Sequence, residues 1–217
     1  MRRPLALLLA LGPALPAVAH PHVFVEAQVA LVVDAQNRLV AVDLSWTYHE
    51  YFSLLLTADL GVDLDGDGVL TGADEAALAA GVLDWPADFT GDLQVTAGGT
   101  PLALSAPEAQ SVAYENGVVI ERHRRPLVEP VPTEEAVAVQ VFDPFYYVAY
   151  TIVGETRIEG GTNCAATYEA ADLNAAYALV DELLYGRPAS GVGPMEEFPE
   201  VGNAFADTIR LTCAASG

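Results

Sequence analysis

Apolar and polar residues alternate along two long stretches near the start of the chain, residues 22–33 and 39–48. A period of two places successive side chains on opposite faces of a strand, so both stretches predict strands with one buried face. Asn37-Arg38 between them is typical of a turn, and the pair therefore predicts a β-hairpin. Shorter apolar stretches predict further strands at residues 93–97, 101–104, 111–114, 118–122, 136–142, 147–152, 155–159 and 205–213. Many short strands indicate a mainly β, sandwich-like fold.

Three segments repeat their apolar residues at helical spacing instead, residues 50–60, 73–83 and 173–185. The third has one apolar face and is followed by Gly186, so it predicts a C-terminal helix. The first two flank a short acidic loop. We therefore expect residues 50–85 to form an EF-hand-like helix-loop-helix inserted into the β fold.

The acidic loop, residues 63–74, reads DLDGDGVLTGAD and carries the sharpest chemical pattern in the chain. Oxygen-bearing side chains stand at loop positions 1, 3, 5, 9 and 12, with Gly68 at position 6, which is the spacing of an EF-hand calcium loop. The glycine permits the sharp turn that brings the oxygens together. The predicted Ca²⁺ ligands are the side chains of Asp63, Asp65, Asp67, Thr71 and Asp74 and the backbone carbonyl of Val69.

Asp74 departs from the usual pattern, because the twelfth position of such loops normally holds a bidentate glutamate. Aspartate is one methylene shorter, so we expect weaker calcium binding and poorer discrimination against magnesium. The alternative is an acidic, glycine-rich surface turn that holds no ion. A single loop without a partner EF-hand is more often a structural clip than a sensor.

The first nineteen residues have the pattern of a cleavable signal peptide. A basic start at Arg2-Arg3 precedes an apolar run, and Ala17-Val18-Ala19 has the small residues of a cleavage site. This predicts a periplasmic or secreted protein whose residues 20–217 form a single mainly β domain. No later stretch is apolar enough for a transmembrane helix, so an integral membrane protein is not expected.

The chain is strongly acidic, with a formal net charge of -21 and no lysine. Binding of nucleic acid depends on a basic surface, so nucleic acid is excluded as an expected partner. The two cysteines, Cys164 and Cys213, are expected to form one disulfide in an oxidising compartment. A thiolate metal site or a nucleophile is the alternative for them.

Cleavage after Ala19 places His20 and His22 at the new amino terminus, separated by Pro21. Two imidazoles and a free amine form a candidate site for Zn²⁺, Cu²⁺, Ni²⁺ or Co²⁺, with His49 as a further ligand. Pro21 has no amide hydrogen to lose, which disables the square-planar mode that uses backbone amides. The alternative is a frayed polar start with no metal.

The remaining candidate features point to no catalytic set. His123 lies among Arg122, Arg124 and Arg125, and we expect a solvated edge strand or a docking patch for an acidic surface. The aromatic residues 142–147 around Asp143 are expected in the core, with a pocket wall as the alternative. The protein is not expected to be an enzyme, and a copper-dependent activity through His20 is the weakest interpretation.

The order of these features resembles the DUF1007 family of bacterial exported proteins. The resemblance rests on residues 20–25 (HPHVFV), 46–53 (WTYHEYFS), the acidic loop, residues 141–146 (VFDPFY), and the two cysteines with FAD at 205–207. The chain departs at His49, where members often carry aspartate. The resemblance implies a divalent-metal-binding accessory role beside an inner-membrane metal transporter. The alternative is an interaction module stabilised by calcium and the disulfide, without a transition metal.

Overall fold

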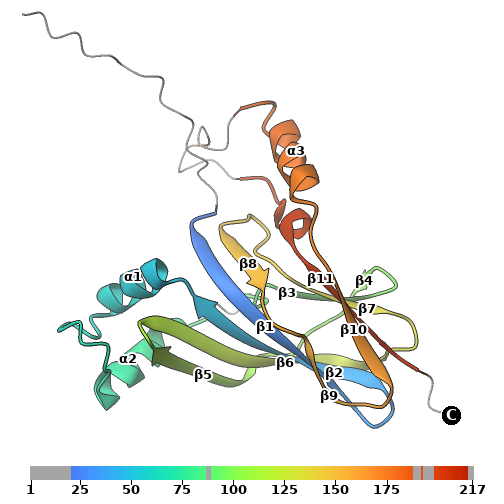
Figure 1. The fold of residues 1–217 in the computed structure, drawn as a ribbon, viewed down its shortest axis with the longest axis horizontal. Helices are drawn as coiled ribbons and strands as arrows, with labels where there is room; N and C mark the ends of the chain where they lie inside the picture. The colour runs from blue at the N-terminus through green and yellow to red at the C-terminus, as the bar shows by residue number, and fades with distance from the viewer. Residues whose placement is uncertain (1–20, 87–88, 188–191, 193–197, 215–217) are drawn as a thin grey trace, which may run out of the picture.

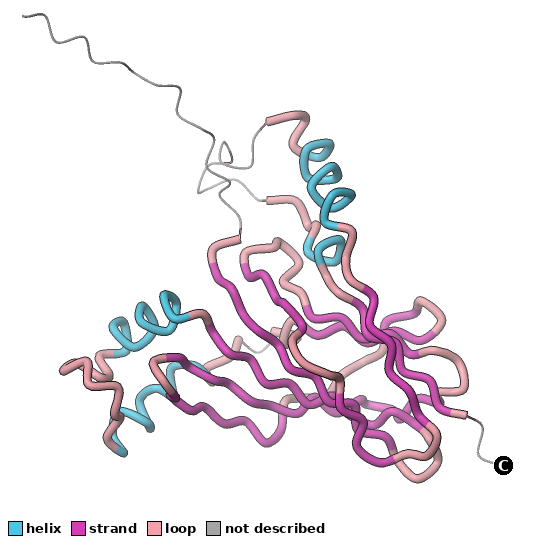
Figure 2. The backbone as a smooth tube through the Cα atoms, in the orientation of Figure 1, coloured by secondary structure: helices cyan, strands magenta, loops and turns pink. Residues whose placement is uncertain are grey.

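The computed structural model describes residues 21–86, 89–187, 192 and 198–214. The strands form two sheets, which confirms the mainly β prediction. Figures 1 and 2 show the strands at the centre and the helices at the periphery. The first sheet has the order β5-β6-β2-β1-β8, with β9 also paired to β1. The second has the order β10-β11-β7-β3-β4.

The first sheet is built on the predicted hairpin of β1 and β2. Its strands are β1 (Val23–Val33), β2 (Arg38–Tyr48), β5 (Glu108–Glu115), β6 (Val118–Pro132), β8 (Val148–Ile152) and β9 (Arg157–Gly160). The odd-numbered residues of β1 are buried and most even-numbered ones are exposed, as the alternation predicts. Both β8 and β9 pair with β1 in parallel, whereas β5, β6 and β2 are antiparallel neighbours.

The second sheet is antiparallel. Its strands are β3 (Leu93–Ala97), β4 (Thr100–Pro101), β7 (Val137–Val141), β10 (Cys164–Glu169) and β11 (Thr208–Cys213). Residues of β3, β7 and β11 join those of β1 and β2 in one buried cluster, so the two sheets pack face to face on a common core. Several details differ from the sequence prediction. Strand β10 was not expected, β4 covers residues 100–101 instead of 101–104, and β6 extends far beyond residue 122. The strand predicted from residue 205 begins at Thr208.

Three α-helices and one short 3₁₀ helix are described, namely α1 (Glu50–Leu60), α2 (Gly72–Val82), α3 (Leu173–Leu183) and η2 (Gly202–Phe205). The helices α1 and α2 lie together beside β5 and β6, and Leu78 of α2 packs with Val119 of β6 (Figure 1). The predicted C-terminal helix, α3, lies apart from this pair and packs through Ala176 and Val180 against Phe205. None of the helices among the described residues is long and apolar enough to cross a membrane.

Candidate functional site

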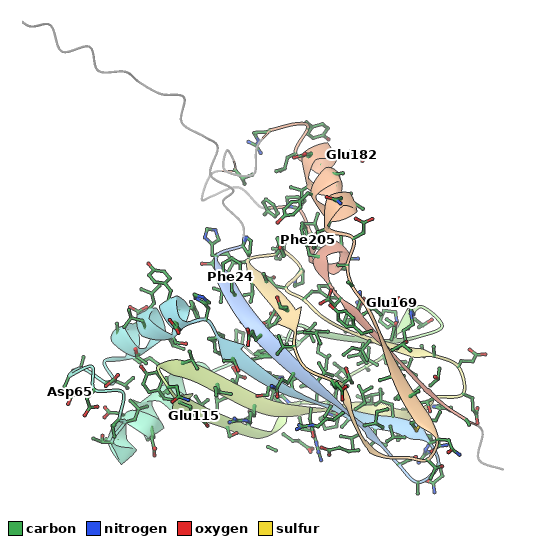
Figure 3. All side chains as sticks on the ribbon, viewed as in Figure 1. Phe24, Asp65, Glu115, Glu169, Glu182 and Phe205 are labelled. Atoms are coloured by element: carbon green, nitrogen blue, oxygen red, sulfur yellow. A yellow bond between two sulfur atoms is a disulfide. The ribbon has the colours of Figure 1, made fainter. Side chains whose placement is uncertain are left out.

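The acidic loop joins α1 to α2 at the outer end of the helix pair, where Figure 3 labels Asp65. Asp63, Asp65 and Asp67 each offer a carboxylate oxygen, and these oxygens lie within 4.8 Å of one another. Within the described part of the chain, no other group of three histidine, cysteine or acidic residues is arranged to hold a metal ion in this way. Hard divalent cations such as Ca²⁺ prefer such oxygen ligands, so the chemistry of the donor set fits calcium.

The backbone of the loop turns back on itself in its first half. Gly68 has a φ of 76°, in the left-handed region that glycine adopts without steric cost. Its N–H donates to Oδ1 of Asp63 over 3.1 Å, and the N–H of Val69 donates to Oδ1 of Asp67 over 2.8 Å. These two bonds fix the positions of the Asp63 and Asp67 carboxylates on the folded loop.

The second half of the loop forms the start of α2. Thr71 is the N-cap: its N–H and its hydroxyl donate to Oδ2 of Asp74 over 3.0 and 2.7 Å, and the N–H of Asp74 donates back to Oγ1 of Thr71. The hydrogen bonds from Thr71 lower the pKa of Asp74. Asp74 is therefore engaged at the helix cap and is not in the group of three converging carboxylates.

The loop is tied to the sheet beneath it. The hydroxyl of Tyr114, on β5, donates to Oδ2 of Asp63 over 3.4 Å. Val62, directly before the loop, is buried with Leu78 and Val119. Ser53 of α1 accepts the buried N–H of Val119 over 3.0 Å. An ion bound at the loop would thus act on the attachment of both helices to β5 and β6.

The two candidate histidines that the structure describes, His22 and His49, stand at different places, one before β1 and the other at the N-cap of α1. His20 lies outside the described residues. His22 is exposed at the start of β1, with its ring centroid 4.7 Å from that of Tyr147. His49 is the exposed N-cap of α1, and its Nδ1 accepts the N–H of Tyr51 over 3.4 Å. The N–H of His49 donates to the carbonyl of Phe24, so His49 stands opposite Phe24 rather than His22.

The basic cluster on β6 differs from its prediction. The prediction of a solvated edge strand is wrong, because β6 lies between β5 and β2 in the sheet. Arg122 and Arg124 do face outward, and Arg124 forms two 2.6 Å hydrogen bonds to Asp43. His123 and Arg125 face inward and are 3% and 5% exposed. Together with Glu121 they form a buried stripe of three ionisable side chains on one strand, which we call the buried polar stripe.

The buried polar stripe is covered by aromatic rings. The hydroxyl of Tyr48 donates to Oε2 of Glu121 over 2.9 Å, and His123 Nδ1 lies 3.4 Å from the other carboxylate oxygen. Burial, followed by the charge of Glu121, raises the pKa of Tyr48 well above its usual value. The rings of Trp46 and Trp85 approach His123 edge-on, with centroids 4.6 and 4.8 Å away. Ionisable groups are costly to bury, so such stripes are candidates for functional sites.

Two neighbouring cavities of about 840 and 630 Å³ lie around this region and share Thr90, Asp92 and Pro144 in their walls. The larger is walled mainly by aromatic and aliphatic side chains. Phe145 and Tyr147 line it and are 42% and 50% exposed, so the prediction that the 142–147 segment belongs to the core is wrong for these two residues. They form a pocket wall instead.

Asp92 stands between the two cavities at the start of β3. It is buried, and its Oδ2 accepts the hydroxyl of Tyr150 over 2.8 Å. Burial raises the pKa of Asp92 to about 7, with the nearby charge of Asp143 acting in the same direction. This carboxyl group therefore changes its protonation state near neutral pH.

Sequence reasoning missed Asp92 and the buried polar stripe. Gly91-Asp92 resembles an ordinary turn, and both faces of β6 carry charges, so alternation alone does not say which face is buried. The disulfide, by contrast, is confirmed: Cys164 and Cys213 are paired across β10 and β11 and are bonded.

Comparison with protein families identifies the chain. Residues 5–213 match the model of the family described as "Protein of unknown function (DUF1007)", and the protein belongs to this family. A search among curated proteins found no match. The description of the family assigns no activity, so a function has to be argued from the geometry above.

Proposed function

We propose that this DUF1007 protein is a divalent-metal-binding accessory protein of a metal transport system, and that its acidic loop binds Ca²⁺. The observation that carries the calcium proposal is the convergence of the Asp63, Asp65 and Asp67 carboxylates within 4.8 Å. The EF-hand-like spacing of the loop supports the same proposal. The carbonyl of Val69 and the side chains of Thr71 and Asp74 would complete the shell.

The N-cap hydrogen bonds of α2 affect how Asp74 would bind a calcium ion. Asp74 shares one carboxylate oxygen with two donors of Thr71, so a bound cation competes with these hydrogen bonds. That competition, together with the shorter side chain, supports weak calcium binding. The role we assign to Ca²⁺ is structural, because the loop is anchored to β5 through Tyr114 and to the helix pair through Val62.

The transport role rests on family resemblance and on the predicted amino terminus. Export by a signal peptide would expose His20 and His22 in the periplasm, where they and His49 would bind Zn²⁺, Cu²⁺, Ni²⁺ or Co²⁺ for an inner-membrane transporter. We propose no enzymatic activity. The second candidate is an interaction module stabilised by calcium and the disulfide. The bonded pair Cys164–Cys213 and the anchoring of the acidic loop to β5 through Tyr114 support this module.

Calcium binding is tested by thermal unfolding of the exported protein with and without Ca²⁺. Binding to the native state alone stabilises it by about 2.7 kcal/mol when the free ion is at 100 times its dissociation constant. The double variant Asp63→Ala/Asp65→Ala should lose this calcium-dependent rise in melting temperature. The matched control is Glu134→Ala/Glu135→Ala, which removes two exposed carboxylates far from the acidic loop in the sequence. This variant should keep the calcium-dependent rise in melting temperature.

Elemental analysis distinguishes the two candidate functions. The protein is purified after natural cleavage, without chelators or a histidine tag. About one calcium and one transition metal per chain supports the accessory role. Calcium without a transition metal supports the interaction module, and a calcium effect that survives in the double variant refutes the loop assignment.

A further inference from the structure

Two of the three guanidinium nitrogens of Arg125 are buried without a hydrogen-bond partner among the described residues. Arg125 is 5% exposed, and its Nε and Nη1 atoms are buried and make no hydrogen bond with the described residues. No carboxylate among those residues lies within ion-pair distance of it. Burial lowers the pKa of Arg125, and no neighbouring charge offsets that effect. An isolated buried cation is strongly unfavourable, so an uncompensated one needs an explanation.

A shortage of carboxylates does not explain the unpaired guanidinium. The chain has 30 acidic residues and 9 arginines and lysines together. Four other arginines have carboxylate partners within 4.0 Å, although they are far more exposed and gain less from pairing. These pairs are Arg38–Asp34, Arg122–Glu115, Arg124–Asp43 and Arg210–Glu169. Arg125, the most buried of these arginines, thus has no counter-charge among the described residues, whereas four more exposed ones do.

Arg125 packs closely against Gly91 and also borders a cavity. It lines the cavity of about 630 Å³, next to β3 and η2. A Cβ atom on Gly91 would lie 2.7 Å from Arg125 Nη1 and 3.3 Å from the ring of Trp85. Gly91 also has a φ of 74°, which side chains rarely adopt. Glycine is therefore favoured here for two reasons, its backbone conformation and the close approach of the guanidinium.

The walls of the cavity indicate what kind of anion fits. Leu93, Val95 and Leu104 make much of the wall apolar, while Gln94 and Asn203 add neutral polar groups. Nε and Nη1 of Arg125 are closed to solvent, which leaves Nη2 to form a charge-assisted hydrogen bond with one carboxylate oxygen. The apolar part of this wall would pack against an apolar body attached to that carboxylate, and the adjoining aromatic cavity shares Thr90, Asp92 and Pro144 with it.

The surrounding charge argues against a dianion such as phosphate. One guanidinium neutralises one negative charge. Asp92 and Glu200 also line the cavity, Asp143 lies close by, and the whole chain has a charge of -21. A second negative charge on the ligand would be repelled at short range and left without a partner.

We propose that this cavity binds a small organic monocarboxylate, whose carboxylate pairs with the guanidinium of Arg125. The ligand supplies the counter-charge that the surroundings of Arg125 lack, and its apolar part packs against Leu93, Val95 and Leu104 of the cavity wall. This site is distinct from the acidic loop between α1 and α2, because none of the loop residues 63–74 lines either cavity. It therefore stands independently of the proposed metal-binding role.

The test compares ligands of one shape and different charge on the full processed chain. Acetate, butyrate and benzoate are titrated by calorimetry and by thermal shift, alongside benzamide, benzylamine and inorganic phosphate. We expect at least one carboxylate to bind, and benzoate to bind at least about tenfold more tightly than benzamide, because a charge-assisted pair is lost in the amide. Absence of binding by all three carboxylates overturns the proposal. Equal binding of benzoate and benzamide, or tighter binding of phosphate or benzylamine, also overturns it.

Two variants locate the site. Arg125→Met keeps an unbranched side chain, although a shorter one, and removes the charge, so carboxylate binding should weaken at least about tenfold. The variant should fold, since removing an unpaired buried charge relieves a cost, and its circular dichroism checks this. Arg122→Met, an exposed arginine on the same strand, is the matched control and should bind normally. Unchanged carboxylate binding in Arg125→Met refutes the assignment, and the ligand comparison on the unmodified chain remains decisive if that variant does not fold.

Discussion

The variant Asp92→Asn tests whether burial of this carboxyl group makes the stability of the protein depend on pH. Burial raises the pKa of Asp92 from 3.8 to about 7. Each pKa unit corresponds to about 1.4 kcal/mol, so ionising Asp92 in the folded protein costs roughly 4 kcal/mol more than in the unfolded chain. Asparagine has a similar shape, cannot ionise, and retains an oxygen that accepts the hydroxyl of Tyr150.

The sign of the effect follows from proton binding. Below pH 4 both states hold the proton on Asp92, and the carboxyl group contributes no difference. Between about pH 4 and pH 7 the folded state keeps the proton while the unfolded state has lost it, so rising pH favours unfolding. The free energy of unfolding of the unmodified protein should therefore fall across this range, relative to that of Asp92→Asn, and level off above pH 7.

The assay is urea-induced unfolding of both proteins at pH values from 4 to 8. The difference in unfolding free energy between Asp92→Asn and the unmodified protein should grow by roughly 4 kcal/mol over this range. Subtracting the two curves cancels the other titrating groups that both share. Asp59→Asn, on the exposed side of α1, is the control for removing one carboxylate. A difference for Asp92→Asn that stays constant with pH refutes the reasoning.

Three further changes test how the elements are held together. Ser53→Ala leaves the buried N–H of Val119 without its acceptor, and urea unfolding should show a loss of about 1–3 kcal/mol; no loss would mean that another group accepts this bond. Replacing both cysteines by alanine removes a cross-link between residues 49 positions apart, which should cost about 4 kcal/mol in the chain-entropy model; an unchanged melting temperature would contradict this. Leu78→Ala opens a cavity between α2 and β6 and should cost about 2–5 kcal/mol, whereas a loss well below this range would show that α2 packs loosely.

Much of the β fold could be predicted from local patterns. The alternation of residues 22–33 and 39–48 matches the buried and exposed faces of β1 and β2, because each side chain's face follows directly from its parity along a strand. The turn at Asn37 was also predicted, but the hydrogen bonds that the Asn37 side chain makes to distant segments were not. Its side chain donates to the carbonyls of Thr162 and Ala214, two segments far along the chain.

Pairing between distant strands could not be predicted in the same way. Strand β10 lacks a clear apolar alternation, since its residues are mostly exposed, and it is held by pairing with β11. Likewise, β8 and β9 pair in parallel with successive halves of β1. Such partners depend on which edges remain free after the hairpin forms, and no local pattern encodes that.

The sequence by itself determined the local chemistry: the acidic loop with its glycine, the hairpin, the C-terminal helix, and a pair of cysteines suited to a disulfide. In these cases spacing along the chain sets the geometry directly. Only the tertiary structure decided that β6 is a central strand and that its charged face around Arg125 and His123 is the buried one. Burial depends on what packs above a strand, and the covering rings come from Trp46 and Trp85, which are remote in sequence.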